Sequence, residues 1–283
     1  MRTLTIATRG SRLALIQAEM IRSALRAKGA EAEFRIVSTK GDRDRVSPIT
    51  AIGGRGLFVT EIERVLLDGE ADIAVHSGKD LPYRLQSGLI IAGVPQAAAP
   101  NDCLIRNKGN EDLRIIGTGS PRRMLECGKF YPDAAYRSIR GNVDTRLGKL
   151  RQGECDGILL AKAGLDRLGA DLSEFDVRVF TPEEFIPSAC QGILAAECRE
   201  DDKETVSLLR SVSHEPSFRR FTAERTMLSL LEADCSAAIG AYSEVDGERV
   251  RVTGFFEGRR SRKEGDYAEV QTLCEAIRHE IIG

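Results

Sequence analysis

Short strand-like runs alternate with helix-like segments along most of the chain, and this alternation is the feature that most constrains its fold. Residues 4–8 predict a strand, and Ser11 is an N-cap for a helix that ends before Gly29. The same region predicts further strands at 34–38, 71–76 and 89–94 and a helix at 57–67. Such alternation is typical of a mainly parallel sheet with helices on both faces.

A second unit of the same kind begins after a break at residues 95–100, where two prolines flank Gln-Ala-Ala-Ala. Residues 193–197 then predict a strand that returns to the first sheet. The two units would therefore be joined by two crossings, which suits a cleft that closes about a hinge. Between the crossings, the sequence predicts strands at 115–116, 136–139 and 157–161 and helices from Pro121 and Val143.

The last part of the chain has a different pattern. Residues 218–231 predict a helix, and a meander with strands at 237–245, 249–257 and 267–273 and a closing helix follows. At roughly 150 residues per domain, the length suggests two large domains or three with one small. The expected bounds are 1–95 with 191–212, then 96–190, then 213–283. The predicted fold class is α/β, with two hinged doubly wound α/β domains, like those of periplasmic binding proteins, and a small α+β C-terminal domain.

Composition excludes several classes of protein. The formal net charge is −2, so no overall positive charge attracts nucleic acid or an anionic membrane. No apolar run reaches the roughly 18 to 20 residues that cross a bilayer, and the first residues lack the pattern of a signal peptide. We therefore expect a cytoplasmic protein with neither a nucleic-acid nor a membrane partner.

Cysteine and histidine usage argues against a metal site. The seven cysteines are odd in number and include no C-x-x-C pair, so neither a disulfide framework nor a structural zinc site is expected. The three histidines form no H-E-x-x-H motif. The chain also lacks the G-x-S-x-G turn of nucleophile-elbow hydrolases and the phosphate-binding P-loop motif.

Arginine dominates the basic residues, with 32 arginines against 9 lysines. Compositional bias explains the overall ratio equally well, but it does not explain clustering. Residues 114–151 carry a local net charge of +6. Because a guanidinium binds carboxylate or phosphate through two parallel hydrogen bonds, this stretch predicts a ligand with several negative charges.

Three strand-to-helix turns carry residues suited to such a ligand. Ser120 is an N-cap and Pro121 fits the first helical position, so free N–H groups of the first turn would face an anion that Arg122 and Arg123 flank. The alternative is a capped helix with two solvated arginines. The same design recurs at residues 8–11 and 140–146.

Lys79 and Asp80 follow the apolar strand predicted at 71–76, so both should emerge at its carboxyl end, where α/β proteins place their sites. An ordinary ion pair at a strand end is the alternative. His76, at the end of the strand, can be explained as a buried side chain with its own hydrogen-bond partner.

Several short motifs follow one another in a characteristic order over nearly the whole chain. They are ATRGSRLALIQA, GGRGLF, ADIAVHSGKDLP, IGTGSPRR, RGNVDTRL, CQG, TAER and LEADC. In this order they resemble the porphobilinogen deaminase family. The resemblance implies three domains and a transferase of haem and tetrapyrrole biosynthesis, which condenses four porphobilinogen molecules into hydroxymethylbilane with loss of ammonia. It also implies a dipyrromethane cofactor, a primer attached covalently through a cysteine.

The resemblance also implies roles for individual residues. Asp80 would be the catalytic carboxylate, which stabilises the positive charge that develops when ammonia leaves a pyrrole. Cys235 would form the thioether with the primer, and residues 40–56 would cover the cleft. The primer would be bound by Ser77, Lys79, Asp80, Thr118, Ser120, Arg122, Arg123 and Arg146. Incoming porphobilinogen would meet Arg9, Ser11 and Arg140, and Gln17 and Gln191 also lie in family motifs.

The chain departs from the family pattern at a few positions. Gly78 stands where methionine is common, and Cys190 stands where glycine is common. The other departures are Arg55 for lysine, Pro121 for leucine and Asn101 for arginine. None of them replaces a residue expected to carry the chemistry, so activity is expected.

Two other classes of protein share parts of this pattern. A two-lobed solute-binding or ligand-sensing protein would have the same hinged plan and an arginine-lined cleft, but no covalent primer. A nucleic-acid-binding protein would use the basic stretch 114–151, yet aromatic residues make up only 5% and tryptophan is absent, so stacking platforms are few. The resemblance favours a monomeric enzyme whose partner is the small molecule porphobilinogen.

Overall fold

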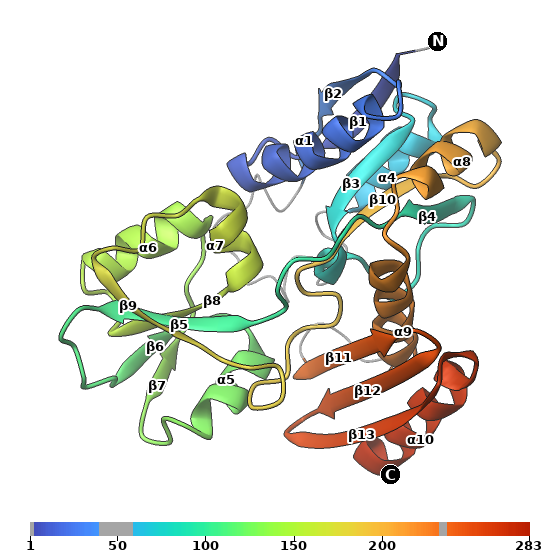
Figure 1. The fold of residues 1–283 in the computed structure, drawn as a ribbon. Coiled ribbons are helices and arrows are strands. Elements are labelled where there is room, and N and C mark those ends of the chain that lie inside the picture. The colour runs from blue at the N-terminus through green and yellow to red at the C-terminus, as the bar shows by residue number, and fades with distance from the viewer. Residues whose placement is uncertain (1–2, 40–58, 232–236) are drawn as a thin grey trace.

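The computed structural model describes residues 3–39, 59–231 and 237–283, which form three sheets with helices packed around them (Figure 1). The N-terminal sheet has the strand order β2-β1-β3-β10-β4, the central sheet β7-β6-β8-β5-β9 and the C-terminal sheet β11-β12-β13. The loop expected at residues 40–56 lies outside the described residues. Because β10 follows all strands of the central sheet in the sequence, two separate segments of the chain form the N-terminal sheet.

Five strands form the N-terminal sheet, and they do not all run the same way. They are β1 (Leu4–Thr8), β2 (Ala32–Ile36), β3 (Ile73–Ser77), β4 (Leu89–Gly93) and β10 (Leu194–Arg199). β1 is parallel to β2 and β3, whereas β10 is antiparallel to β3 and β4, so the sheet is mainly parallel, as predicted, and β10 alone runs against the other strands. The chain leaves for the central sheet after β4 and re-enters from there, which reverses β10. The predicted return strand is confirmed.

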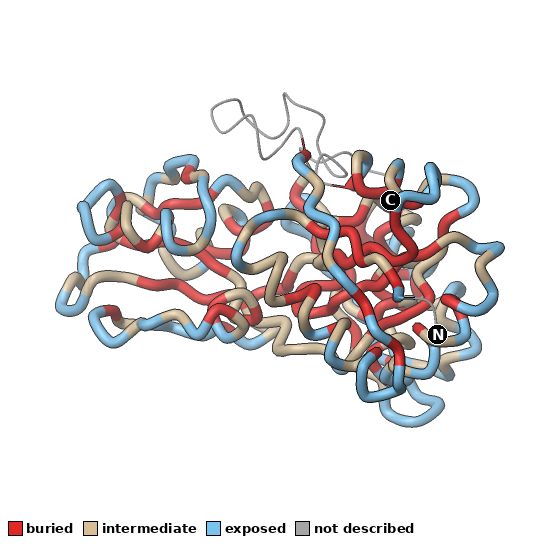
Figure 2. The backbone as a smooth tube through the Cα atoms, turned by 90° about the horizontal axis from the view of Figure 1, so that it is seen from above, coloured by how far each residue is buried: buried red, intermediate tan, exposed pale blue. Residues whose placement is uncertain are grey.

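Helices cover both faces of this sheet, because successive side chains of a strand point to opposite sides. Ile6 packs with α1 (Arg12–Arg26) and α8 (Lys203–Ser211) on one face. Ala7, the next residue of β1, packs with α4 (Thr60–Leu67) on the other. Figure 2 shows the result, with buried backbone in the middle of the molecule and exposed loops around it.

The central sheet repeats this mixed arrangement. Its strands are β5 (Asp102–Asn107), β6 (Ile115–Gly117), β7 (Ala135–Arg137), β8 (Gly157–Ala161) and β9 (Phe175–Val179). β6 is parallel to β7 and β8, and β5 is antiparallel to β8 and β9. The sequence pattern predicted neither β5 nor β9. Most of β9 is exposed at the edge of the sheet, so it lacks a continuous apolar run.

Both faces of the central sheet are also covered. α5 (Pro121–Gly128) packs with Ile116 on one face. α6 (Val143–Arg151) and α7 (Lys162–Leu168) pack with Ile158 on the other. The helices expected from Pro121 and Val143 are therefore confirmed, and α7 was not predicted.

Two crossing segments, 94–101 and 180–193, join the N-terminal and central sheets and lie side by side. The N–H of Ala98 donates to the carbonyl of Gly192 at 3.1 Å. Gly192 has φ of +85°, and a Cβ there would overlap the carbonyl oxygen of Ala98, so only glycine fits. The two crossings expected from the sequence are thus in contact where they pass each other.

The C-terminal sheet packs one face against two helices. It consists of β11 (Ile239–Asp246), β12 (Arg249–Phe256) and β13 (Arg259–Asp266), covered by α9 (Glu215–Leu231) and α10 (Val270–Ile282). The strand predicted at 267–273 was wrong, because that stretch forms a 3₁₀ turn, η2 (Tyr267–Glu269), and the start of α10. The true third strand escaped prediction because it is an edge strand of mostly charged, exposed residues.

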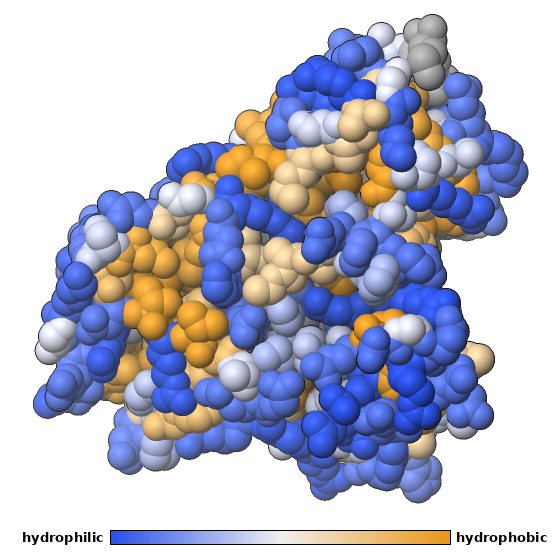
Figure 3. Space-filling model, viewed as in Figure 1, coloured by the Kyte–Doolittle hydropathy of each residue, from blue (hydrophilic) through white to orange (hydrophobic). Residues whose placement is uncertain are grey.

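The fold class predicted from the sequence is confirmed: two α/β units with helices on both faces and a small α+β unit. Figure 3 shows a largely hydrophilic face, with apolar groups gathered mainly over the central sheet and where it meets the N-terminal part. None of the described helices has the length and hydropathy required to cross a membrane.

Glu63 of α4 provides a test of this packing. It is buried, its Oε1 atom has no hydrogen-bond partner among the described residues, and burial, followed by the charge of Glu197, raises its pKa. A carboxyl group whose pKa is higher in the folded state favours folding at acid pH, and this contribution is lost as pH rises from 4.5 through the folded pKa. Glu63→Gln imitates the protonated form, so it should raise the thermal midpoint at pH 8 and have little effect near pH 4.

Glu33→Gln is the matched control, because Glu33 is exposed on β2. It should leave the thermal midpoint unchanged at both pH values. A Glu63→Gln protein that melts at or below the wild-type temperature at pH 8 would contradict the account.

Candidate active site

The segment after β3 projects charged groups toward the return crossing. It forms a single 3₁₀ turn, η1 (Gly78–Asp80). The N–H of Gly78 donates to the carbonyl of Ile193 at 2.9 Å, and Nζ of Lys79 donates to Oε1 of Gln191 at 3.4 Å. As predicted, the charged residues of this motif emerge at the carboxyl end of a strand.

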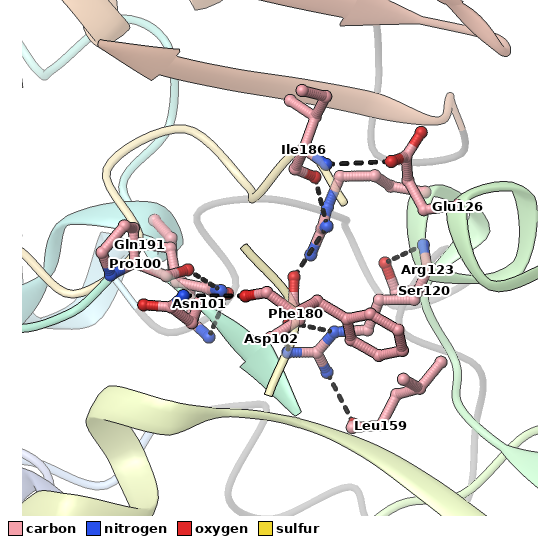
Figure 4. Close-up of polar contacts among 12 residues, drawn as sticks. Pro100, Asn101, Asp102, Ser120, Arg123, Glu126, Leu159, Phe180, Ile186 and Gln191 are labelled. Atoms are coloured by element: carbon pink, nitrogen blue, oxygen red, sulfur yellow. Dashed lines mark hydrogen bonds and ion pairs between the residues drawn. The ribbon is translucent and has the colours of Figure 1, made fainter. Parts of the chain in front are cut away.

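Asp102, the first residue of β5, anchors two arginines of α5 (Figure 4). Its side chain is completely buried, and Oδ2 lies 2.8 Å from Nη1 of Arg122. Oδ1 lies 2.7 Å from Nη2 of Arg123 and 2.9 Å from its Nε. Burial would raise the pKa of Asp102, but the two guanidiniums outweigh burial and lower it to about 2.

Each guanidinium also donates a hydrogen bond to a backbone carbonyl. Nη1 of Arg122 donates to the carbonyl of Ile186 at 2.6 Å, and Nη1 of Arg123 donates to the carbonyl of Leu159 at 2.9 Å. Both arginines are buried. The alternative of two solvated arginines on a capped helix is therefore wrong.

The start of α5 has the predicted cap. The hydroxyl of Ser120 accepts from the N–H of Arg123 at 3.4 Å, and Pro121 occupies the first helical position. Thr118 is buried just before this cap, and its Oγ1 accepts from the N–H of Ser120 at 3.2 Å. The N–H of Arg123 is thus engaged by the cap rather than free for a ligand.

Arg146 brings a further positive charge to this region from α6. Asn142 caps the helix by accepting from the N–H of Thr145 at 2.8 Å, and Nε of Arg146 donates to the carbonyl of Gly141 at 2.8 Å. Burial lowers the pKa of Arg146 to about 10. The charges of Arg123 and Arg140 add to this shift, and Asp80 opposes it.

Lys79 completes a group of charges drawn from both α/β units. Burial, followed by the charge of Arg123, lowers the pKa of Lys79 to about 8, and Asp80 and Asp102 oppose this shift. We call Lys79, Arg122, Arg123, Arg140 and Arg146 the cation cluster. Lys79 and Arg146, whose pKa values burial and the charge of Arg123 lower, are short of counter-charge, so the cluster fits a ligand that brings several carboxylates.

The other predicted site residues lie outside the cation cluster. Ser11 caps α1, and its hydroxyl accepts from the N–H of Ala14 at 3.3 Å. Ser77 and the buried Gln17 form a hydrogen-bonded pair at 2.9 Å. Arg9 is half-buried just after β1, and Cys235 lies outside the described residues.

Sequence reasoning missed Asp102, the central counter-charge of the site. One signal was available: a carboxylate opens an otherwise apolar run, Asp-Cys-Leu-Ile. Gln191 was named only as part of a motif, yet its Oε1 accepts from Lys79 and its Nε2 donates to the carbonyl of Pro100 at 2.6 Å. Such partners come from distant segments, so sequence spacing cannot identify them.

Residues 4–207 match the family model described as porphobilinogen deaminase, dipyromethane cofactor binding domain. Residues 218–276 match the porphobilinogen deaminase C-terminal domain.

Similar curated proteins bear the same family name. The chain is 42% identical over 262 residues to the porphobilinogen deaminase of Maridesulfovibrio salexigens, an alignment that covers 90% of this chain and 84% of that protein. It is 37% identical over 287 residues to the porphobilinogen deaminase of Acetivibrio thermocellus, an alignment that covers 98% of this chain and 97% of that protein.

Among solved structures, the chain is similar to an ancestral cationic amino acid solute binding protein, with 15% sequence identity and a TM-score of 0.48. The match covers 74% of this chain and 87% of that protein. It is also similar to an arginine-specific periplasmic binding protein of Salmonella typhimurium, with 11% sequence identity and a TM-score of 0.45. The match covers 77% of this chain and 94% of that protein.

Removing Asp102 should destabilise the protein strongly. Asp102→Ala leaves two buried guanidiniums without their counter-charge, so the free energy of unfolding should fall by about 3–5 kcal/mol in urea denaturation. Asp112→Ala is the control, because Asp112 pairs with Arg114 on the exposed surface. It should cost at most about 1 kcal/mol. Equal losses in the two variants would contradict the assignment of Asp102 as the anchor.

Proposed function

The chain belongs to the porphobilinogen deaminase family, and we propose that within it Asp80 is the catalytic carboxylate and Cys235 the attachment point of the primer. The chain is a transferase of tetrapyrrole biosynthesis. It condenses four porphobilinogen molecules head to tail into hydroxymethylbilane, with release of ammonia, on a covalently bound dipyrromethane.

The cation cluster is the observation that carries the proposed roles. Every pyrrole unit brings an acetate and a propionate, so a growing chain held in one cleft accumulates carboxylates. Burial and the charge of Arg123 lower the pKa of Lys79 and of Arg146, and the nearby Asp102 is already paired with Arg122 and Arg123, so positive charge is in excess at these two side chains. The excess positive charge therefore matches the acids of the ligand.

We propose a division of labour within the cluster. Arg122, Arg123 and Arg146, with Lys79, Ser77, Thr118 and Ser120, bind the primer, and Arg9, Ser11 and Arg140 bind the incoming substrate. When bound, the dipyrromethane supplies the free pyrrole carbon to which the first substrate unit is joined. The contact of Lys79 with Gln191 supports this arrangement, because it directs the lysine toward the crossing between the two units.

Asp80 is suited to stabilise positive charge at the reacting pyrrole. It lies in the turn that follows β3, close enough to Lys79 and Arg146 to affect the pKa of both. Loss of ammonia from porphobilinogen places positive charge on the pyrrole ring and its N–H. A fixed carboxylate stabilises this charge. At a separation of ~4 Å and an effective dielectric near 20, this attraction is worth about 4 kcal/mol, roughly a thousandfold in rate if it arises only in the transition state.

The proposal includes the organisation of the whole chain. The two α/β domains are residues 1–95 with 191–212 and residues 96–190, with a hinge at the crossings, and the third domain is residues 213–283. The gap between the two family matches, after residue 207 and before residue 218, supports the last boundary. We also propose a monomer that acts in the cytoplasm. No disulfide links the six cysteines that the structure describes, which is in keeping with a reducing compartment.

Asp80→Asn tests the catalytic role. The variant keeps the shape of the side chain and loses its charge, so kcat should fall about a thousandfold while the primer content of the purified enzyme stays near wild type. Asp133→Asn, in an exposed turn, is the control and should keep full activity. An Asp80→Asn enzyme with kcat within a few-fold of wild type would rule out this role.

Cys235→Ser tests the attachment point. A serine hydroxyl is a far poorer nucleophile than a thiolate, so peptide mapping should find no dipyrrole on the segment that contains position 235. Cys155→Ser should retain the adduct at Cys235. An adduct on any other cysteine of the wild-type chain would refute the assignment.

A further inference from the structure

The return crossing turns sharply at Cys190, which has a left-handed backbone conformation with φ of +60°. Residues other than glycine are strained in this region, and such strain persists only where the surroundings hold it. The Cys190 side chain is buried, with Sγ 3.8 Å from the carbonyl oxygen of Phe221. A restraint elsewhere in the structure must therefore keep this residue in place.

Glu224 of α9 supplies that restraint. Its Oε2 accepts a hydrogen bond from the N–H of Cys190 at 2.6 Å. Its Oε1 accepts from Nε of Arg220 at 2.8 Å and from the N–H of Ser243 at 3.1 Å. The carboxylate is buried, so these charge-assisted bonds form in a setting of low dielectric, where they are strong. The C-terminal part of the chain thus anchors the crossing.

The anchored side chain faces the first residue of η1. A Cβ built on Gly78 would lie 2.9 Å from the Cβ of Cys190 and 3.3 Å from the carbonyl oxygen of Ile193. Non-bonded carbon atoms do not pack at 2.9 Å, so glycine at position 78 and a side chain at position 190 belong together. These are two of the positions at which the chain departs from its family pattern, and the structure places them in contact.

We propose that Cys190 is a positioning residue for the turn that carries Asp80. The backbone of Gly78 rests against the Cβ of Cys190, and Glu224 holds that Cβ in place. A displacement of the turn at Gly78 therefore moves Lys79 and Asp80 relative to the arginines of the cation cluster. The inference rests on the proposed role of Asp80.

The same contact ties the turn to α9. Glu224 lies on α9 and bonds directly to Cys190. The turn is thus joined to α9 through one hydrogen bond and one packing contact.

A pair of substitutions tests the packing contact. Gly78→Ala adds the clashing Cβ, so kcat per primer-loaded enzyme should fall by about tenfold to a hundredfold, while primer content and the KM for porphobilinogen change much less. Cys190→Gly removes the opposing Cβ and suits a φ of +60°. Adding Cys190→Gly to Gly78→Ala should therefore restore most of the lost kcat.

Cys190→Ala is the matched control, because it removes Sγ and keeps Cβ. In that background Gly78→Ala should remain impaired. Equal rescue by Cys190→Ala and Cys190→Gly, or rescue by neither, would overturn the proposal. So would a Gly78→Ala enzyme as active as Gly148→Ala, whose added Cβ meets no atom within 4 Å.

Thermal midpoints of the same variants distinguish positioning from packing alone. Rescue of the midpoint together with kcat supports the proposal, and rescue of the midpoint without kcat overturns it. If Gly78→Ala does not accumulate as folded protein, the two double variants give the same comparison. Failure of the role of Asp80 is seen separately: an active Asp80→Asn enzyme overturns that role and leaves the rescue of kcat by Cys190→Gly intact.

Discussion

The buried ion pairs of Asp102 with Arg122 and Arg123 hold the site together. Burial of three charges is unfavourable unless they are paired and hydrogen-bonded. Here Asp102 pairs with both arginines, and each guanidinium also donates to a backbone carbonyl. The pairs join the start of β5 to α5, so the two guanidiniums cannot move independently of the sheet. Burial lowers the pKa of Lys79 and of Arg146, and the charge of Arg123 lowers both further. Under the proposed roles, a polycarboxylate ligand would meet cations whose positions are set before it binds, which would reduce the entropy lost on binding.

The return crossing is the second constraint, because all three parts of the molecule are tied to it. Gln191 contacts Lys79 of the N-terminal part through its side chain, and its carbonyl accepts from Nη2 of Arg220 in α9 at 3.0 Å. The next carbonyl, of Gly192, accepts from Nη2 of Arg167 in the central part at 2.6 Å. A hinge at this segment would move each sheet as a unit with its core intact. That behaviour suits a cleft whose ligand grows during the reaction.

The sequence predicted what local pattern determines and missed what tertiary contact determines. The caps at Ser11 and Ser120, the alternation of strands and helices and the return strand all follow from neighbours in the chain, and the structure confirms them. Edge strands such as β13 were missed because their side chains are exposed and charged, so no apolar period marks them. Asp102 was missed for another reason: its role as a counter-charge depends on arginines that only the folded chain brings near. The contact between Gly78 and Cys190 likewise joins residues that no spacing rule connects.

The proposed function requires an acid-bearing pyrrole chain that is bound covalently to the protein. The intact mass of the purified chain, before and after incubation with porphobilinogen, tests this most directly. The account predicts a mass above that of the polypeptide by one dipyrrole, followed by further species that differ by single pyrrole units as substrate is added. A chain that keeps the bare polypeptide mass at every porphobilinogen concentration would contradict it.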